Sequence, residues 1–143
     1  MTIESAEPKV KKVFICSPFS PKGETAEEMT EDLIWNITQA QKACMYAAYK
    51  GYVPYAPHLY FTQFLDDGDR EEREYGQTLG LTWLFGCDEL WVIGRRISRG
   101  MLKEIEQSEK WGIPVKHYVG RRTKEERLLD AIFHPEIEIK EMI

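Results

Sequence analysis

The chain has little that would tie it to an oxidising compartment, a membrane or a nucleic-acid polymer. Its 143 residues include only three cysteines, Cys16, Cys44 and Cys87, and their wide spacing fits neither a disulfide framework nor a zinc site. No apolar run approaches the roughly 20 residues that a spanning helix needs. With 19 basic against 24 acidic residues, the net charge of -5 repels nucleic acids and anionic membranes. We therefore expect buried thiols, no membrane contact and no nucleic-acid partner.

Signals for export and for common cofactors are also missing. The polar start MTIESAEPKVKK lacks the hydrophobic core of a secretory signal, which favours a cytoplasmic protein. The sequence contains no G-x-G-x-x-G dinucleotide fingerprint and no cluster of His, Cys and acidic residues at metal-ligand spacing. We therefore expect neither a metal ion nor another cofactor.

The composition that is present predicts one folded domain. Hydrophobic residues make up 43% and charged residues 30%, which is ordinary for a globular protein of this length. We expect a flexible N-terminal tail over residues 1–11, an α/β domain over 12–133 and a C-terminal tail over 134–143. The alternating tail EIEIKEMI fits either sheet pairing or a contact with another chain.

Short apolar segments alternate with helical patterns along the domain. Strands are predicted at 13–16, 52–57, 89–94 and 113–119, the second of them restricted by its two prolines. The first helix is predicted to begin at the capping box that opens with Thr25, and we place Trp83 and Leu102 on the buried sides of two later helices. Strands separated by helices predict right-handed crossovers and a doubly wound parallel sheet of four or five strands.

In such a sheet, ligands bind beyond the carboxyl ends of the strands. The loop that follows Gly94 is the most informative of these, and it contains Arg95, Arg96, Ser98, Arg99 and Gly100. Ser98 is a predicted helix N-cap, and the free N–H groups, the helix dipole and the guanidinium groups all favour a phosphate or carboxylate. The alternative interpretation is a solvated turn with an ordinary serine cap.

Glu104 follows Ser98 by six residues, about 9 Å along a helix that rises ~1.5 Å per residue. Its side chain tilts back toward the helix N-terminus, so an anion at Ser98 would place the rest of a small ligand within its reach. A carboxylate in this position can attack a sugar anomeric carbon and form a covalent glycosyl-enzyme. The alternative is a structural or solvent-facing glutamate.

Together these segments resemble the nucleoside 2-deoxyribosyltransferase superfamily. The resemblance rests on VFICSPF, a helix with Asn36, PYAPHLY, WLFGCDELWVIG, the motif Ser98-x-Gly100-x-x-x-Glu104 and GIPV, and it covers about residues 12–119. The nearest branch is the 2′-deoxynucleoside 5′-monophosphate N-glycosidases, with uncharacterised phage-type relatives. In that branch a serine replaces the sugar-binding aspartate of the transferases and contacts the phosphate, and Ser98 matches this form.

The resemblance implies a role for each residue that matches a family motif. Glu104 would be the nucleophile. The residues that would bind the substrate and its phosphate are Ser17, Pro18, Phe19, Arg95, Ser98, Arg99, Gly100 and Met101. Relatives form dimers or larger assemblies, so the resemblance also implies a homo-oligomer, for which residues 134–143 are a candidate contact.

Two positions depart from the family pattern. Gly80 stands where the family has an aspartate that acts as general acid, and Phe14 stands where it has a tyrosine whose hydroxyl meets the nucleophile. His58 and Tyr60, in the loop after the second strand, are candidate replacements. The acidic residues Asp66, Asp67, Asp69, Glu72 and Glu74 are further candidates, unless they form only a solvated helix start.

The sequence therefore predicts an enzyme that hydrolyses the N-glycosidic bond of a nucleoside 5′-monophosphate or a related nucleotide. Two alternatives remain open. Loss of the acid and of the hydroxyl is also consistent with a non-catalytic nucleotide-binding module, and the superfamily includes deoxyribosyl transfer between bases.

Overall fold

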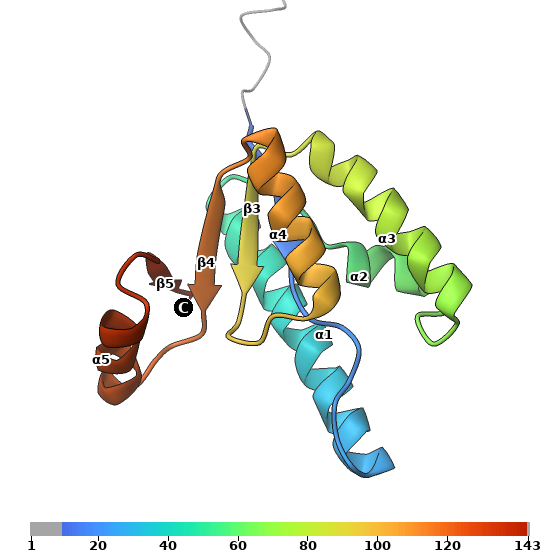
Figure 1. Cartoon of the computed structure of the whole chain (residues 1–143), viewed down its shortest axis with the longest axis horizontal. Coiled ribbons are helices and arrows are strands. Elements are labelled where there is room, and N and C mark those ends of the chain that lie inside the picture. Colours follow the sequence, from blue (N-terminus) through green and yellow to red (C-terminus); the bar gives the residue numbers. More distant parts are fainter. Residues whose placement is uncertain (1–9, 143) are drawn as a thin grey trace, which may run out of the picture.

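The computed structural model describes residues 10–142, which form one five-stranded sheet with helices on both faces (Figure 1). The strands are β1 (Lys12–Cys16), β2 (Val53–Tyr55), β3 (Glu89–Ile93), β4 (Val115–Val119) and β5 (Ile139–Glu141). The helices are α1 (Ala26–Tyr49), α2 (Pro57–Tyr60), the short 3-10 helix η2 (Phe61–Gln63), α3 (Arg70–Phe85), α4 (Arg99–Trp111) and α5 (Lys124–Phe133).

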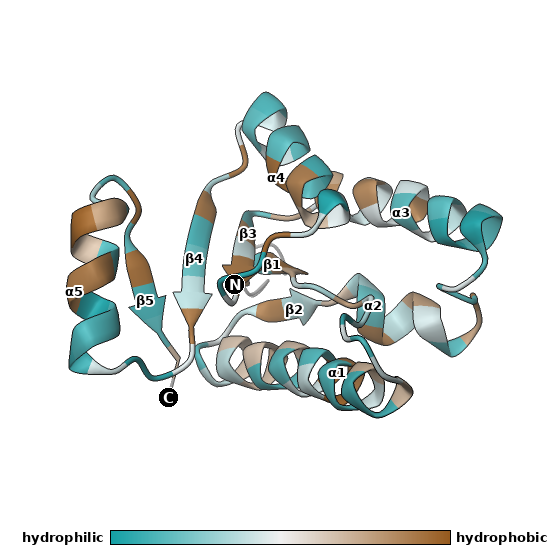
Figure 2. Ribbon diagram, turned by 60° about the horizontal axis from the view of Figure 1, so that its bottom comes forward, coloured by the Kyte–Doolittle hydropathy of each residue, from teal (hydrophilic) through white to brown (hydrophobic). Residues whose placement is uncertain are grey.

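The sheet is parallel throughout, in the order β2-β1-β3-β4-β5. The chain moves from β1 to β2 through α1 and then crosses back to β3 through α3, so the direction of winding reverses between β1 and β3. Figure 2 shows α1 on one side of the strands and α3 with α4 on the other, whereas α5 lies beside β5 at the far edge. The predicted doubly wound α/β domain is confirmed.

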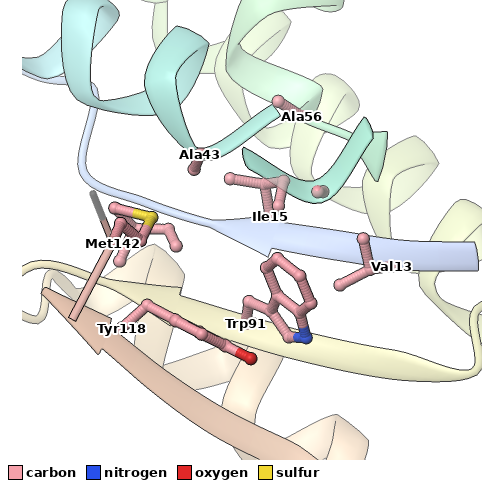
Figure 3. Close-up of a cluster of buried hydrophobic side chains, with 9 residues drawn as sticks. Val13, Ile15, Ala43, Ala56, Trp91, Tyr118 and Met142 are labelled. Carbon is pink, nitrogen blue, oxygen red and sulfur yellow. The ribbon is translucent and has the colours of Figure 1, made fainter. Parts of the chain in front are cut away.

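Two apolar clusters hold the layers together, one on each face of the sheet. Val13, Ile15 and Trp91 pack against Ala43 and Ala47 of α1 (Figure 3). On the other face, the residues of β1 and β3 pack against α3 and α4, and this cluster includes Phe14, Cys16, Leu84, Leu90, Val92 and Met101. The strands β1 and β3 are buried on both faces, which is why both segments are continuously apolar in the sequence.

The helix ends follow the predicted capping chemistry. The Thr25 hydroxyl accepts a hydrogen bond from the N–H of Glu28 at 3.1 Å, and α1 begins there. The Ser98 hydroxyl accepts from the N–H of Met101 at 3.2 Å, which confirms Ser98 as the N-cap of α4. Gly112 ends α4 with a left-handed φ of 70°, a conformation that favours glycine.

Two of the expected core positions are wrong. Trp83 is 51% exposed, because it stacks on Tyr55 of the edge strand β2 with ring centroids 4.3 Å apart and no strand lies beyond. Leu102 is also exposed, because Met101 and Ser108 occupy the buried side of α4. Cys44 is only partly buried, in contrast to Cys16 and Cys87, and all three thiols are free.

The C-terminal segment pairs in the sheet. Residues 139–141 form β5 beside β4, and Met142 joins the core, so the domain continues beyond residue 133. Most of the expected N-terminal tail, residues 1–9, lies outside the described residues. Among residues 10–142 no helix has both the length and the apolar character needed to cross a membrane.

Candidate active site

The candidate site lies at the carboxyl ends of β1 and β3, where the winding of the sheet reverses. Ser17 follows β1, and the turn from Gly94 to Ser98 follows β3 and leads into α4. Gly94 has a φ of 85°, a left-handed conformation that favours glycine and lets the chain turn directly after the buried strand. This reversal point is the usual ligand position in an open α/β sheet.

Glu104 of α4 lines a small cavity with a volume of about 40 Å³. The cavity lies between α4, α3 and the segment that follows β2. Its lining residues other than Glu104 include His58, Asp67, Glu72, Arg73, Gln77 and Gly80. Glu104 therefore lies in a cavity beside residues of three separate elements.

Burial is the main influence on the Glu104 carboxyl, and it raises the pKa of Glu104 to about 8. A hydrogen bond with the Cys16 thiol opposes this rise without cancelling it. The thiol is affected in turn, since burial and then the charge of Glu104 raise the pKa of Cys16. No ion pair to Glu104 is formed within residues 10–142. A carboxyl group with a strongly perturbed pKa in a cavity is typical of a catalytic site.

The N-terminus of α4 is open beside this cavity. A Cβ atom at Gly100 would lie 3.3 Å from Nε2 of Gln77 and 3.9 Å from the Ser98 hydroxyl, so glycine keeps this corner clear. The first N–H groups of a helix have no acceptor within it. Met101, in contrast, is fully buried and its N–H already bonds to Ser98, so it supports the site from the core.

The loop after β1 supplies a second polar group. Ser17 is buried, and its hydroxyl has no hydrogen-bond partner within residues 10–142. Phe19 stacks on His58, with ring centroids 5.3 Å apart and an interplanar angle of 21°. Pro18 lies on the other side of the crevice, where it lines a separate groove with Arg95. The loop that carries the Ser17 hydroxyl therefore also contacts His58, which lines the Glu104 cavity.

His58 belongs to the cavity, whereas Tyr60 does not. Burial lowers the pKa of His58 to about 4, against the opposing effects of Asp67 and of a hydrogen bond to the backbone of Ser17. The imidazole is therefore neutral at pH 7. Tyr60 is 52% exposed and lines an apolar pocket with Tyr55 and Trp83.

The acidic stretch divides into structural and cavity-facing residues. Asp69 is the N-cap of α3, Asp66 accepts from the N–H of Gly68, and Glu74 pairs with Arg70 on the helix surface. Asp67 and Glu72 line the Glu104 cavity. Asp67 also accepts from the Ser20 hydroxyl at 2.9 Å.

The arginines do not act as a single anion-binding group. Arg95 donates to Asp130 at 2.7 and 2.9 Å and to Glu126 at 3.3 Å, so its guanidinium is committed to α5. Arg99 is exposed at the first position of α4 and forms no ion pair within the described residues.

Arg73 and Gln77 were missed by the sequence reasoning, although both line the cavity. Their spacing to Gly80, at i, i+4 and i+7 on α3, is the signal that they share one helix face. Gly80, where the resemblance implies a general acid in other proteins, lines the same cavity as Glu104. Phe14 is fully buried, and the hydroxyl of its pairing partner Tyr55 is buried without a partner within residues 10–142.

No metal site is evident, since the described residues contain no group of three or more His, Cys, Asp and Glu side chains placed to hold an ion. The arrangement instead offers the Glu104 carboxyl group and the N-terminus of the same helix, α4.

Comparison with solved structures identifies the fold. A 2-deoxyribosyltransferase from Bacillus psychrosaccharolyticus matches with a TM-score of 0.57 and 16% identity, covering 92% of this chain and 99% of the other. A conserved protein from Enterococcus faecalis V583 matches with a TM-score of 0.50 and 17% identity, covering 92% and 82%. The Clostridium botulinum CMP N-glycosidase BcmB gives a TM-score of 0.45 and 14% identity, covering 93% and 88%.

Comparison of sequences gives the family. No curated protein matches the chain. The model of a domain of unknown function, DUF7768, matches residues 11–118, which include β1, β2, β3, all but the last residue of β4 and all of the candidate site. The expected deoxyribosyltransferase-like fold is confirmed. The chain therefore belongs to the DUF7768 family and has the fold of the nucleoside 2-deoxyribosyltransferases.

Proposed function

We propose that this protein hydrolyses the N-glycosidic bond of a nucleoside 5′-monophosphate, with Glu104 as the nucleophile. The observation that carries the proposal is the Glu104 carboxyl, which faces a cavity without an ion pair among residues 10–142 and whose pKa burial raises to about 8. The fold supports the proposal at the level of the superfamily, since a deoxyribosyltransferase shares it.

In the first step, an oxygen of the ionised Glu104 carboxylate attacks C1′ of the sugar. The bond from C1′ to the base nitrogen breaks, the electron pair leaves with the base, and the base takes up a proton, for which the cavity offers the carboxyl groups of Asp67 and Glu72. Water then attacks C1′ of the glycosyl-enzyme and gives its proton to the group that protonated the base, and the C1′–O bond to Glu104 breaks, which releases the sugar phosphate and restores the carboxylate of Glu104. The cavity limits access of bulk water, so charge formed at C1′ is stabilised mainly by the carboxylate.

The phosphate would bind across the crevice between β1 and β3. The buried Ser17 hydroxyl is a free donor on one side. On the other side, the open N-terminus of α4 at Gly100 provides N–H groups and the positive end of the helix dipole. Arg99 adds an exposed positive charge at the same end. Of the two arginines that sequence reasoning assigned to the phosphate, only Arg99 is therefore available.

The test compares base release from a panel of ribo- and deoxynucleoside 5′-monophosphates by the wild type and by Glu104→Gln, measured by chromatography. We expect the variant to lose at least about 10³-fold in kcat, as is typical when a covalent nucleophile is removed. Glu106→Gln is the matched control, because Glu106 is exposed on the same helix. The wild-type kcat/KM should rise with pH up to about 8, as Glu104 ionises.

Full activity in Glu104→Gln would contradict the proposal. So would a nucleotide-dependent rise in wild-type Tm without any free base, which would identify a binding module instead. If added free base accelerated turnover, the acceptor would be a second base and the reaction would be a transfer.

A further inference from the structure

Asp32 and Asn36 lie one turn apart on α1 and both bond to the loop that follows β1. The carboxylate of Asp32 accepts from the N–H of Lys22 at 2.7 Å, and Nδ2 of Asn36 donates to the carbonyl of Phe19 at 3.0 Å. Asn36 is only 3% exposed, although an amide is a costly group to bury unless its hydrogen bonds are satisfied. These two side chains therefore fix the loop against α1.

Arg96, in the loop that follows β3, reaches the same two side chains. Its Nη2 donates to Asp32 at 3.2 Å and to Asn36 at 3.3 Å, and its Nη1 donates to Asp32 at 3.3 and 3.5 Å. The planar guanidinium thus bridges two acceptors at once, a geometry that a lysine cannot reproduce. The hydrogen bond from Lys22 and then the contact with Arg96 lower the pKa of Asp32, against the opposing effect of burial.

The two joined loops carry opposite halves of the candidate site. One contains Ser17 and Phe19, the latter stacked on His58, and the other leads to Ser98 and the N-terminus of α4. Because β1 and β3 feed helices on opposite faces of the sheet, their loops diverge after the strands end. Neither apolar cluster contains Asp32, Asn36 or Arg96, so their bonds connect the loops outside the core.

We propose that Asp32, Asn36 and Arg96 form a clamp that holds the two phosphate-facing loops at a fixed separation, with Arg96 acting as a positioning residue. This rests on the proposed function for the identity of the ligand, but the clamp itself is a property of the free protein. A preorganised site binds its ligand without first ordering the loops. Loosening the clamp therefore weakens binding of the phosphate more than it slows chemistry at Glu104, because none of the three clamp residues lines the Glu104 cavity.

A competing role for Arg96 gives the opposite prediction for one substitution. If Asp32 merely held Arg96 away from a phosphate that Arg96 binds, Asp32→Asn would release the guanidinium and tighten binding. The clamp predicts weaker binding for Asp32→Asn and for Arg96→Lys, with KM for a nucleoside 5′-monophosphate raised about tenfold and kcat within about twofold.

The deciding experiment has one arm without ligand and one with it. In the free protein, hydrogen exchange is measured by mass spectrometry in the two loops, residues 17–22 and 94–100. Asp32→Asn and Arg96→Lys should each accelerate exchange in both loops, about tenfold or more, although each substitution lies in or beside only one. Glu74→Gln is the control, since it removes an ion pair with Arg70 on the surface of α3.

The outcomes separate the clamp from the proposed function. Acceleration confined to the loop nearest the substitution, or tighter binding in Asp32→Asn, overturns the clamp. If the wild type released no base, the proposed function would fail, yet the exchange arm would still decide whether the clamp exists. If Glu74→Gln changed KM and kcat as much as the clamp variants do, the effect would be assigned to a general loss of stability, and the clamp would be overturned as well.

Discussion

Two glutamates at opposite ends of the sheet show that burial alone does not determine the pKa of a carboxyl group. Glu89 begins β3 at the amino end of the sheet and is 3% exposed. Its carboxylate accepts from Nε1 of Trp91 at 2.9 Å and from Lys116 at 2.9 Å, with Lys11 and Tyr52 at 3.3 and 3.4 Å. Glu104 lies in the cavity near the carboxyl ends of the strands, where its carboxyl meets the Cys16 thiol.

The pKa values of the two carboxyls shift in opposite directions. Burial would raise the pKa of Glu89, but the hydrogen bonds from Trp91 and Lys116 outweigh it and the pKa is lowered. At Glu104 burial prevails, and the pKa rises to about 8. A buried carboxylate with a full set of donors is a structural group, whereas one held without them keeps its capacity to react. The partners of each carboxyl therefore distinguish the two ends of the sheet.

The largest effect should follow from breaking the structural carboxylate. We expect Glu89→Gln to lower the free energy of unfolding by about 3 kcal/mol at pH 7, because the charge-assisted hydrogen bonds that the buried carboxylate accepts from Trp91 and Lys116 would be weakened or lost. The stabilisation by Glu89 is present above its unfolded-state pKa and is lost as pH falls through the lowered folded-state pKa. The deficit should therefore shrink toward pH 3, measured by urea unfolding. If Glu109→Gln, at an exposed position of α4, lowered the free energy of unfolding by the same amount, the effect would not be specific to the buried carboxylate.

A second change adds another carboxyl group to the cavity of Glu104. Gly80 lines the same cavity, and a Cβ atom there would lie 3.8 Å from Cβ of Pro57, an ordinary contact. We expect Gly80→Asp to raise kcat for base release about 10²-fold by supplying a general acid. Gly80→Asn is the matched control, since it adds the same volume without a proton to donate. Equal rates in the two variants would show that the cavity already contains an acid.

Much of the fold was predictable because its signals are local. The continuously apolar strands β1 and β3, the N-caps at Thr25 and Ser98 and the glycine that ends α4 each depend on a few neighbouring residues. The C-terminal strand β5 left two interpretations open, because three alternating residues pair equally well with a sheet or with another chain. The partner strand β4 is separated from β5 by a helix, so the sequence does not show that the two pair, and only the folded chain does.

The site was harder to predict, because its residues depend on tertiary partners. The spacing of Ser98 and Glu104 placed both on α4, and the structure adds the cavity that Glu104 faces. Arg95 was assigned to the phosphate, but its partner Asp130 lies 35 residues away in sequence and on a different helix. Arg73 was missed because the direction of a helix face is known only once the helix is packed.

The smallest expected effect concerns the contribution of Glu104 to stability. Between the unfolded-state pKa of a glutamate and about pH 8, folded Glu104 keeps a proton that the unfolded chain releases, so the stability of the wild type falls as pH rises through this window. Glu104→Gln lacks this dependence. We expect it to unfold with a free energy about 2 kcal/mol above that of the wild type at pH 9 and nearly equal to it at pH 4. For Glu89→Gln, the difference in free energy of unfolding from the wild type should instead grow as a deficit when pH rises from 3 to 7. If either variant showed the pH dependence expected of the other, the partners of the two carboxyls would not explain their pKa values.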